Sequence, residues 1–575
     1  MGRTSLSVVF AGSGGSGAMT AGQLFLQAAA AAGYYGIMTQ LFGAQVRGGE
    51  SAALVQVSTE PVESPPDRYE LFVAIDWEKI DQFAPEIPLD DGSIVICDPA
   101  AGQVPAAIAK SKARVLTVSF DDPAVTRLER ALRGRRANVC AAALVATLIG
   151  LPSRHLDSAL IKLLGKKSAE VFEANKRALK YGAQLAKTLP VTLALDDAAP
   201  GERWFISGNR AAALGALRGG VRFVGCYPIT PATDLVEWLA PHIRELGGNL
   251  VLAEDELAAI NMVLGASYGG IPAMTVTAGP GLSLMTEAIG LGVAAEIPAV
   301  IIDVMRAGPS TGIASKTEQS DLNIAIYGSH GDAPRIVLAP TSIGDCAYTT
   351  EWAVGLAETI QTPVLVLSDQ AMGQASGAIP APTRRPSPGK RRTETKAGEP
   401  FKRYAIGSDP NTPMPRPGTE GCEWVAEGLT HNEAGLPVSA AAAHAAQINK
   451  RAKKLAQIDP GADWGECWGD GDTAIITFGS GVAPAREAAI RRNKAGQATR
   501  VIALRLLSPL PRKALRDALE GTRRVVVLEQ NHTGQLLQYL RANDAVPAST
   551  ESMARPGPLP FRPAEILSRL IEERA

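Results

Sequence analysis

Three consecutive acids, Glu254, Asp255 and Glu256, stand at the head of a stretch of small and apolar residues that runs from 253 to 270. Larger apolar side chains recur in this stretch at helical spacing: Leu257, Ile260, Val263 and Leu264. Wound as an α-helix, the stretch turns Glu256 toward this apolar stripe and Asp255 away from it. An inward carboxylate can hold or transfer a proton. Acids in a first helical turn also simply favour the helix dipole, so both interpretations are open for Glu256 at this point.

The stretch "GCYPITPATD" follows an apolar strand at 221 to 226. Pro231 suits the first position of a helix, with Thr230 as its N-cap. The Thr230 hydroxyl and the free N–H groups of the first turn then converge at the end of the strand. Such a place can bind a small carboxylate, although an N-cap alone is more often structural.

The loop "MRAGPSTGIASKTEQSD" also follows an apolar strand, and it contains Arg306, Thr311 and Lys316. The guanidinium fork of Arg306 can bind a carboxylate through two hydrogen bonds. Taken singly, such an arginine is more often a surface residue. Polar loops at the carboxyl ends of parallel strands are, however, where open α/β sheets bind their ligands.

The glycine loop Gly12-x-Gly14-x-x-Gly17 lies between a strand and a helix and suggests a dinucleotide site. The expected ribose-binding acid is missing, because the next strand ends in Thr39 and Gln40. A turn that packs the helix, or that faces another ligand, is therefore the favoured interpretation. Further on, "LFGAQVRGGES", with Arg47, fits a hairpin turn and an anion-binding loop equally well.

These residues sit in three predicted α/β domains. The first covers 1–190, and the second, at 204–380, alternates helices with Val/Ile/Leu strands that indicate a parallel sheet covered on both faces. Residues 381–465 are rich in proline and predict a long connector, whose basic run from 384 to 396 is expected to be a solvated surface. A smaller α/β domain follows at 466–575.

The chain has 575 residues, with 57 Lys and Arg against 58 Asp and Glu. This balance gives no field that would attract nucleic acid or anionic lipid. No apolar stretch is long enough to predict a membrane span and no signal peptide is apparent, so a cytoplasmic location is expected. The six cysteines and six histidines are widely dispersed, which predicts that any iron–sulfur cluster belongs to another polypeptide.

Four motifs in this order, "YPITPATD", "AEDELAAINMVLGASYGG", "TAGPGLSLMTEAIG" and "RAGPSTGIASKTEQSD", resemble the α subunit of the 2-oxoacid:ferredoxin oxidoreductases. The N-terminal "GSGGSG" and "AQVRGGES" resemble the γ domain that some members carry fused ahead of α. The wording of the last motif and the γ–α fusion resemble 2-oxoglutarate-using members more than pyruvate-using ones. The resemblance implies a γ domain, a pyrimidine-binding domain and a C-terminal domain like that of transketolase.

The same resemblance implies a CoA-dependent enzyme that uses thiamine diphosphate, shared with a β subunit. That subunit is expected to hold Mg²⁺ with the diphosphate and a [4Fe–4S] cluster that passes electrons to ferredoxin, in a dimer of heterodimers. Glu256 is then the carboxylate that activates the aminopyrimidine ring, so catalysis becomes its favoured role. The resemblance implies further site residues. The cofactor set is Tyr227, Pro228, Gly279, Gly281 and Ser283; the substrate set is Thr230, Arg306, Thr311 and Lys316; and the CoA or subunit contacts are Gly12, Gly14 and Arg47.

Three alternatives remain open. The same chemistry could act on pyruvate or branched 2-oxoacids. If 2-oxoglutarate is the substrate, its second carboxylate needs a cation, and the options are Lys316 and a residue of the β subunit. The glycine loop at Gly12 could serve an NAD-linked dehydrogenase. The chain could also be a non-catalytic assembly subunit.

Overall fold

We describe a computed structural model over residues 2–43, 50–78, 80–125, 136–165, 167–393 and 400–572. Arg47 and residues 394 to 396 of the basic run lie outside these ranges. The chain divides into two compact units, and each has its own hydrophobic core. The first comprises Met1–Ser207, Gln374–Ala381 and Arg562–Glu565, and the second comprises Gly208–Gly373, Pro382–Phe561 and Ile566–Ala575.

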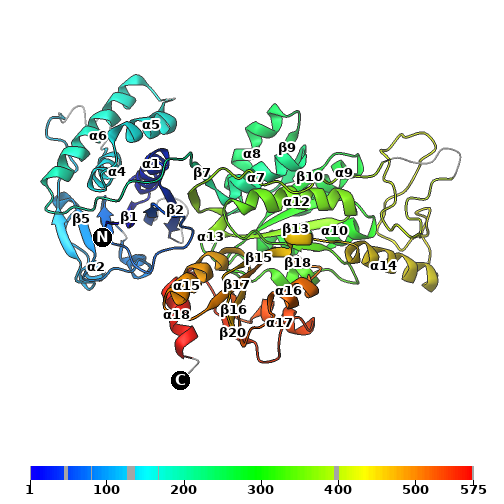
Figure 1. The fold of residues 1–575 in the computed structure, drawn as a ribbon. Helices are drawn as coiled ribbons and strands as arrows, with labels where there is room; N and C mark the ends of the chain where they lie inside the picture. The colour runs from blue at the N-terminus through cyan, green and yellow to red at the C-terminus, as the bar shows by residue number, and fades with distance from the viewer. Residues whose placement is uncertain are drawn as a thin grey trace. The chain divides into compact units, whose positions relative to one another are not determined.

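The first unit is an eight-stranded sheet in the order β6-β5-β4-β1-β3-β2-β14-β7. Its strands are β1 (Ser5–Ser13), β2 (Tyr35–Phe42), β3 (Glu50–Ser58), β4 (Leu71–Ala74), β5 (Ile94–Cys97), β6 (Arg114–Thr117), β7 (Trp204–Ser207) and β14 (Ser376–Ile379). One face is covered by α1 (Ala18–Ala31), α4 (Ala137–Leu148), α5 (Ser153–Leu164) and α6 (Ala169–Thr188), and the other by short turns and α2 (Ala106–Ala109) (Figure 1). Strand β14 follows residues 208–373 of the second unit in sequence, yet it joins this sheet between β2 and β7.

The second unit contains a seven-stranded sheet in the order β18-β12-β13-β11-β10-β8-β9. Its strands are β8 (Phe223–Cys226), β9 (Asn249–Leu252), β10 (Ala273–Thr277), β11 (Ala299–Met305), β12 (Ile336–Leu338), β13 (Pro363–Asp369) and β18 (Leu506–Ser508). All neighbours are parallel except β18, which pairs antiparallel with β12. The buried strands β10, β11 and β13 have every residue covered, because helices pack on both faces.

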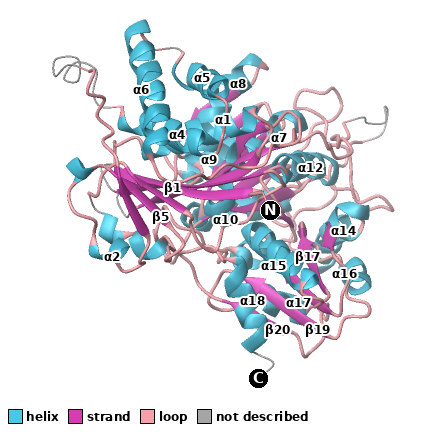
Figure 2. Ribbon diagram, turned by 60° about the vertical axis from the view of Figure 1, so that its left-hand side comes forward, coloured by secondary structure: helices cyan, strands magenta, loops and turns pink. Residues whose placement is uncertain are grey.

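The helices of this region alternate with its strands along the chain. Figure 2 draws the helices cyan and the strands magenta. They are α7 (Gly208–Gly219), α8 (Thr233–Glu245), α9 (Glu256–Tyr268), α10 (Gly279–Ala294), α11 (Leu322–Tyr327), α12 (Asp345–Ile360) and α13 (Gln370–Gly373). Helix α9 packs against α10 and β10, whereas α12 packs against α7 and β13. The α/β architecture predicted from the sequence is confirmed.

A five-stranded sheet, in the order β15-β17-β16-β19-β20, follows in the same unit. Its elements are β15 (Gly465–Trp468), β16 (Thr473–Thr477), β17 (Thr499–Leu504), β19 (Arg524–Glu529) and β20 (Glu551–Ala554), with α15 (Val482–Lys494), α16 (Arg512–Ala518) and α17 (Gln535–Ala542). The last described helix is α18 (Pro563–Glu572). Residues of both sheets meet in one hydrophobic cluster, which includes Leu365, Ile476 and Phe478.

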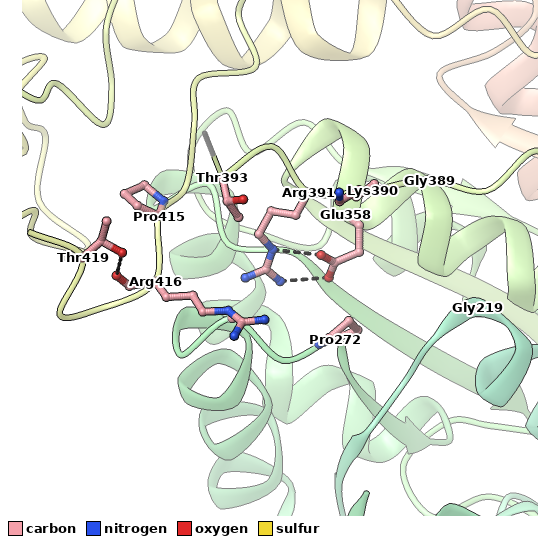
Figure 3. A pocket seen from close by; sticks show the side chains of 11 residues that line it. Gly219, Pro272, Glu358, Gly389, Lys390, Arg391, Thr393, Pro415, Arg416 and Thr419 are labelled. Atoms are coloured by element: carbon pink, nitrogen blue, oxygen red, sulfur yellow. Dashed lines mark hydrogen bonds and ion pairs between the residues drawn. The ribbon is translucent and has the colours of Figure 1, made fainter. Parts of the chain in front are cut away.

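The proline-rich segment packs onto the second unit, where it buries Tyr404, Met414 and Trp424 in the core and continues into α14 (Ala441–Ala456). Its basic run is mostly exposed, as predicted, but the prediction is wrong for Arg391. The Arg391 guanidinium is buried because Nε and Nη2 donate to the two carboxylate oxygens of Glu358, at 2.8 and 2.9 Å (Figure 3). A charge-assisted bidentate pair makes such burial tolerable.

Arg391 and Glu358 also border a pocket of about 460 Å³ (Figure 3). Its lining includes Pro272, which directly precedes β10, and Gly219, which ends α7. The pocket therefore lies at the amino end of β10. The polar loops predicted to bind ligands follow the carboxyl ends of the strands, so this pocket is not the predicted site.

Candidate active site

Helix α9 begins at Glu256, and Asp255 is its N-cap. The Ala258 N–H donates to Asp255 Oδ1 at 2.7 Å, which explains the outward acid as a helix cap. Glu256 is only 7% exposed, and no donor among the described residues hydrogen bonds to its carboxylate. Leu257 is 49% exposed, so its predicted place in the buried stripe is wrong. The helix buries Glu256 in its core-facing surface instead.

The Glu256 carboxylate lies against the first turn of α10. A Cβ built at Gly281 would lie 2.7 Å from Glu256 Oε1 and 2.1 Å from Thr277 Oγ1. A Cβ at Gly279 would lie 2.6 Å from Asp321 Oδ2. Positions 279 and 281 are therefore closed to any side chain, because Asp321, Thr277 and Glu256 already approach the backbone there. Glycine at these two positions is what allows the approach.

The sequence predicts that the loops carrying Arg306 and Thr230 meet at one edge of the sheet, and the two residues are in contact. Arg306 directly follows β11, is 8% exposed, and donates from Nη1 to the Thr230 carbonyl oxygen at 2.6 Å. Its Nε has no partner among the described residues. Burial lowers the pKa of Arg306, and the nearby Asp321 carboxylate partly offsets that effect. A buried guanidinium with an unused N–H fits a ligand carboxylate.

Thr230 is not a helix N-cap, so that prediction is wrong. The N-cap of α8 is Ala232, and the helix starts at Thr233. The Ala232 N–H donates to the Ile229 carbonyl at 2.9 Å, which closes a turn ahead of the helix and moves its start along the chain. The turn is also fixed by Asn209, whose Nδ2 donates to the Pro231 carbonyl at 2.9 Å and to the Asp234 carboxylate. Burial raises the pKa of Asp234 to about 6, despite the Asn209 hydrogen bond.

The loop that carries Arg306 is held by the C-terminal α/β region through Gln319, which is fully buried. Gln319 Nε2 donates to the Phe478 carbonyl at 2.9 Å, and the Gln530 N–H donates to Gln319 Oε1 at 3.0 Å. Nearby, Glu318 accepts from the Gly308 and Gly557 N–H groups. The C-terminal region thus contributes to the site by fixing the end of this loop.

Two further acids lie beside this loop. Asp303, on β11, is fully buried, and it pairs in register with Thr277 of β10. No donor reaches either of its carboxylate oxygens among the described residues, nor Asp321 Oδ2. Burial, together with Asp321, raises the pKa of Asp303 well above its usual range. Burial also raises the pKa of Asp321 to about 6.

The remaining predicted residues are less enclosed. Tyr227, Pro228, Ser283 and Thr311 are exposed, and Lys316 is half-buried in the loop after Arg306. Ser283 Oγ donates back to the Gly279 carbonyl at 3.1 Å. Gly12 is buried near the end of β1, and Gly14 is exposed in the turn that follows; both belong to the first unit.

Comparison with known proteins decides the family. The profile described as "Pyruvate flavodoxin/ferredoxin oxidoreductase, thiamine diP-bdg" matches residues 214–450. "Pyruvate ferredoxin/flavodoxin oxidoreductase" matches 7–185, and the transketolase C-terminal domain matches 467–554. The 2-oxoglutarate synthase subunit KorA of Methanothermobacter marburgensis is 36% identical, over 64% of this chain and 99% of its own length. This chain belongs to the 2-oxoacid:ferredoxin oxidoreductase family.

Two other relatives extend this result. The 2-oxoglutarate oxidoreductase subunit KorA of Mycobacterium tuberculosis is 37% identical over 71% of this chain, which covers 64% of that longer protein. The structure of 2-oxoglutarate:ferredoxin oxidoreductase from Magnetococcus marinus, "with 2-oxoglutarate, coenzyme A and succinyl-CoA bound", aligns with a TM-score of 0.88 and 33% identity over all of both chains. The three-domain organisation of this oxidoreductase chain, with γ-like, thiamine-diphosphate-binding and transketolase-C domains, is therefore established.

The site in this oxidoreductase chain fits the pyrimidine end of thiamine diphosphate. A buried carboxylate without a donor is the group that an aminopyrimidine ring nitrogen requires as its partner. The absence of a side chain at Gly281 lets the Glu256 carboxylate approach the first turn of α10. No cluster of three His, Cys, Asp or Glu side chains that could hold a metal ion occurs in the described part of the chain. In the same residues, no helix is long and apolar enough to cross a membrane.

The sequence interpretation missed Asp303, Gln319 and Asp321 as parts of the site. Asp303 had a signal, because it is the one acid inside the buried strand "AVIIDVM". Gln319 had none, because its partner Gln530 is 211 positions away in the chain.

Proposed function

We propose that this chain provides the proton-transferring carboxylate and the substrate pocket for CoA-dependent oxidative decarboxylation of a 2-oxoacid, with 2-oxoglutarate preferred and ferredoxin as the electron acceptor. One observation carries the proposal: the buried Glu256 carboxylate, which lacks a donor in the described residues and lies against the glycine turn of a thiamine-diphosphate-binding domain. The preference for 2-oxoglutarate is supported by the names of the related proteins.

Bound thiamine diphosphate supplies the carbon nucleophile that adds to the 2-oxoacid and accepts the electron pair when CO₂ leaves. The Glu256 carboxylate, on a side chain that is only 7% exposed, would hold the proton at the ring nitrogen of the aminopyrimidine. Tyr227, Pro228, Gly279, Gly281 and Ser283 would line the ring.

Arg306 binds the 2-oxoacid carboxylate with its free N–H groups, while its bond to the Thr230 carbonyl fixes the direction of the guanidinium. Thr230 and Thr311 complete this side of the pocket. The second carboxylate of 2-oxoglutarate is bound by Lys316 or by a residue of a partner chain.

A β subunit completes the site in this proposal. It carries Mg²⁺ with the diphosphate and the [4Fe–4S] cluster, and two such heterodimers associate in the cytoplasm. Large apolar side chains are exposed on the elements around Glu256 and Arg306, which supports the binding of another subunit there. They are Tyr227, Val251, Leu252, Leu257, Leu284 and Ile313. Gly12, Gly14 and Arg47 are proposed to contact CoA or a subunit.

An NAD-linked dehydrogenase is not favoured. The loop at Gly12 is already occupied by Asp76, which accepts from the Ser13 N–H and from Ser13 Oγ, both at 2.9 Å. Strand β3 also lies between β1 and β2. A dinucleotide fold would place its first two strands side by side and leave the loop N–H groups for the pyrophosphate.

The decisive experiment compares Glu256→Gln with Glu254→Gln in the complex with the β partner. The exposed Glu254 is the matched control, since it lies two residues away. We expect Glu256→Gln to lower 2-oxoglutarate- and CoA-dependent viologen reduction by about 100- to 10,000-fold, with an unchanged unfolding temperature and a fully active control. Wild-type rates in Glu256→Gln would refute the assigned role and favour an assembly subunit. Assays with pyruvate and branched 2-oxoacids test the substrate in parallel.

A further inference from the structure

Asp303 and Asp321 make a buried carboxyl pair next to the residues that form the candidate site. Asp303 comes from the middle of β11, and Asp321 from the end of the loop that begins at Arg306. Asp321 Oδ2 also faces the Gly279 backbone at the start of α10. Asp321 therefore faces the proposed cofactor turn from the end of the loop that begins with the proposed substrate arginine.

Neither the carboxylate oxygens of Asp303 nor Asp321 Oδ2 receives a hydrogen bond from a donor in the described residues. Two ionised carboxylates cannot share such a place, because burial and mutual repulsion both penalise the second charge. A proton on one of them converts the repulsion into a hydrogen bond. Asp303 is the better carrier, since it is the more deeply buried of the two.

The other charged groups that act on the pair are Glu318 and Arg306. Glu318 is satisfied by the Gly308 and Gly557 N–H groups, at 3.1 and 3.0 Å. Arg306 acts on Asp321 electrostatically, and no ion pair within 4.0 Å joins them in the described part of the chain. Arg306 thus feels the Asp321 charge while its free N–H groups remain available to a ligand.

We propose that Asp303 keeps a proton at neutral pH and donates it in a hydrogen bond to Asp321, so that the pair carries one negative charge, on Asp321, and that this charge sets how strongly Arg306 binds the substrate carboxylate. The inference rests on the proposed function, because it takes Arg306 as the carboxylate-binding residue. Asp321 and Asp303 are positioning residues here. Because the Asp321 charge weakens substrate binding, bound substrate favours protonated Asp321 by the same factor. Part of a proton is therefore taken up from solvent only near the pH at which Asp321 titrates, and no bond other than this O–H bond changes.

The sign of the effect follows from like-charge repulsion. As the pH rises through about 6, Asp321 becomes ionised and opposes the incoming 2-oxoacid anion. The KM for the 2-oxoacid therefore rises with pH. A coupling of this kind amounts to about fivefold or more in affinity, whereas kcat changes less because the pair does not touch the reacting atoms.

The test measures kcat and KM for 2-oxoglutarate from pH 5.5 to 8, in the complex, for wild type, Asp321→Asn and Asp303→Asn. We expect about a fivefold rise of KM in wild type, a low and flat KM in Asp321→Asn, and a wild-type profile in Asp303→Asn. The last result follows because an asparagine amide replaces the protonated acid as donor. A pH-dependent KM in Asp321→Asn, or a flat profile in Asp303→Asn, would overturn the proposal.

A second measurement does not depend on the function. Infrared difference spectra of the full chain at pH 7, in H₂O and D₂O, should show a protonated carboxylic acid band that Asp303→Asn removes and Asp98→Asn leaves in place. Asp98 is a suitable control because it is also buried but accepts hydrogen bonds from the Ala100 and Phe120 N–H groups. Retention of the whole band in Asp303→Asn would refute the proton on Asp303. The proposed substrate site would be refuted instead if Asp303→Asn loses the band as expected but Arg306→Gln leaves the KM for 2-oxoglutarate unchanged.

Discussion

Glu256 and Glu296 are both buried glutamates of the second unit, but their surroundings are opposite. Glu296, just after α10, is 1% exposed and is surrounded by three cations. Lys450 Nζ lies 2.8 Å from its Oε1, and Lys454 Nζ 2.5 Å from its Oε2. Burial alone would raise the pKa of Glu296, but these cations and Arg403 overcome it and lower the pKa to about 2. Glu256 has no such partner in the described residues.

The same contrast separates two regions. In the proline-rich segment and α14, the buried Arg391 and Lys450 each contact a buried carboxylate, that of Glu358 and that of Glu296 respectively. The carboxyl ends of β10 and β11 bury Glu256 and Asp303 with no cation in contact in the described chain. Buried charge is expensive without a partner. Paired charges therefore fix a fold, whereas unpartnered ones mark a place that a ligand or a proton must complete.

The largest expected effect tests the paired side of this comparison. Glu296→Gln leaves Lys450, Lys454 and Arg403 as buried cations without their shared counter-ion. We expect the free energy of unfolding to fall by about 3–5 kcal/mol, measured by chemical denaturation, while the folded fraction retains its turnover. A loss of turnover without a loss of stability would mean that Glu296, like Glu256, acts in the reaction, and it would contradict a purely structural role for Glu296.

The sequence predicts the position of the candidate site at one edge of the sheet better than it predicts the details of that site. Helical periodicity predicted that Glu256 points inward, and the structure agrees. The same periodicity misplaces Leu257, because it takes the buried face of the helix from the large apolar side chains alone. The buried face of α9 also includes the small residues Ala259 and Ser267, which moves its centre onto Glu256 and leaves Leu257 about 90° away.

Contacts between distant parts of the chain could not be predicted in this way. Arg391 looked like one more residue of an exposed basic run, because its partner Glu358 lies on α12, outside the segment. β14 belongs to the first sheet although it follows β13 of the second. Periodicity and composition describe neighbours along the chain, whereas burial of a charge is decided by tertiary partners.

A smaller effect tests the unpartnered side. Asp321→Asn removes a carboxyl whose pKa is raised from 3.8 to about 6 by burial. Between these pH values the native state binds more protons than the unfolded state, so wild-type stability falls as the pH rises through this window. At pH 7 we expect Asn to be more stable than Asp by about 3 kcal/mol. Denaturation at pH 4, 5.5 and 7 checks this, and parallel curves for the two proteins would contradict it.

The smallest expected effect uses Arg392, the neighbour of Arg391. Its guanidinium lies 3.0 Å from Asp409, but both side chains are about half exposed, at 51% and 56%. Solvent already compensates both charges, so Arg392→Gln should change the free energy of unfolding by less than about 1 kcal/mol. Arg391→Gln in the same denaturation assay is the positive control, since it strands the buried Glu358 carboxylate. Equal losses in the two variants would mean that burial does not decide the worth of an ion pair here, and the reading of Glu256 as an unpaired functional acid would lose its physical basis.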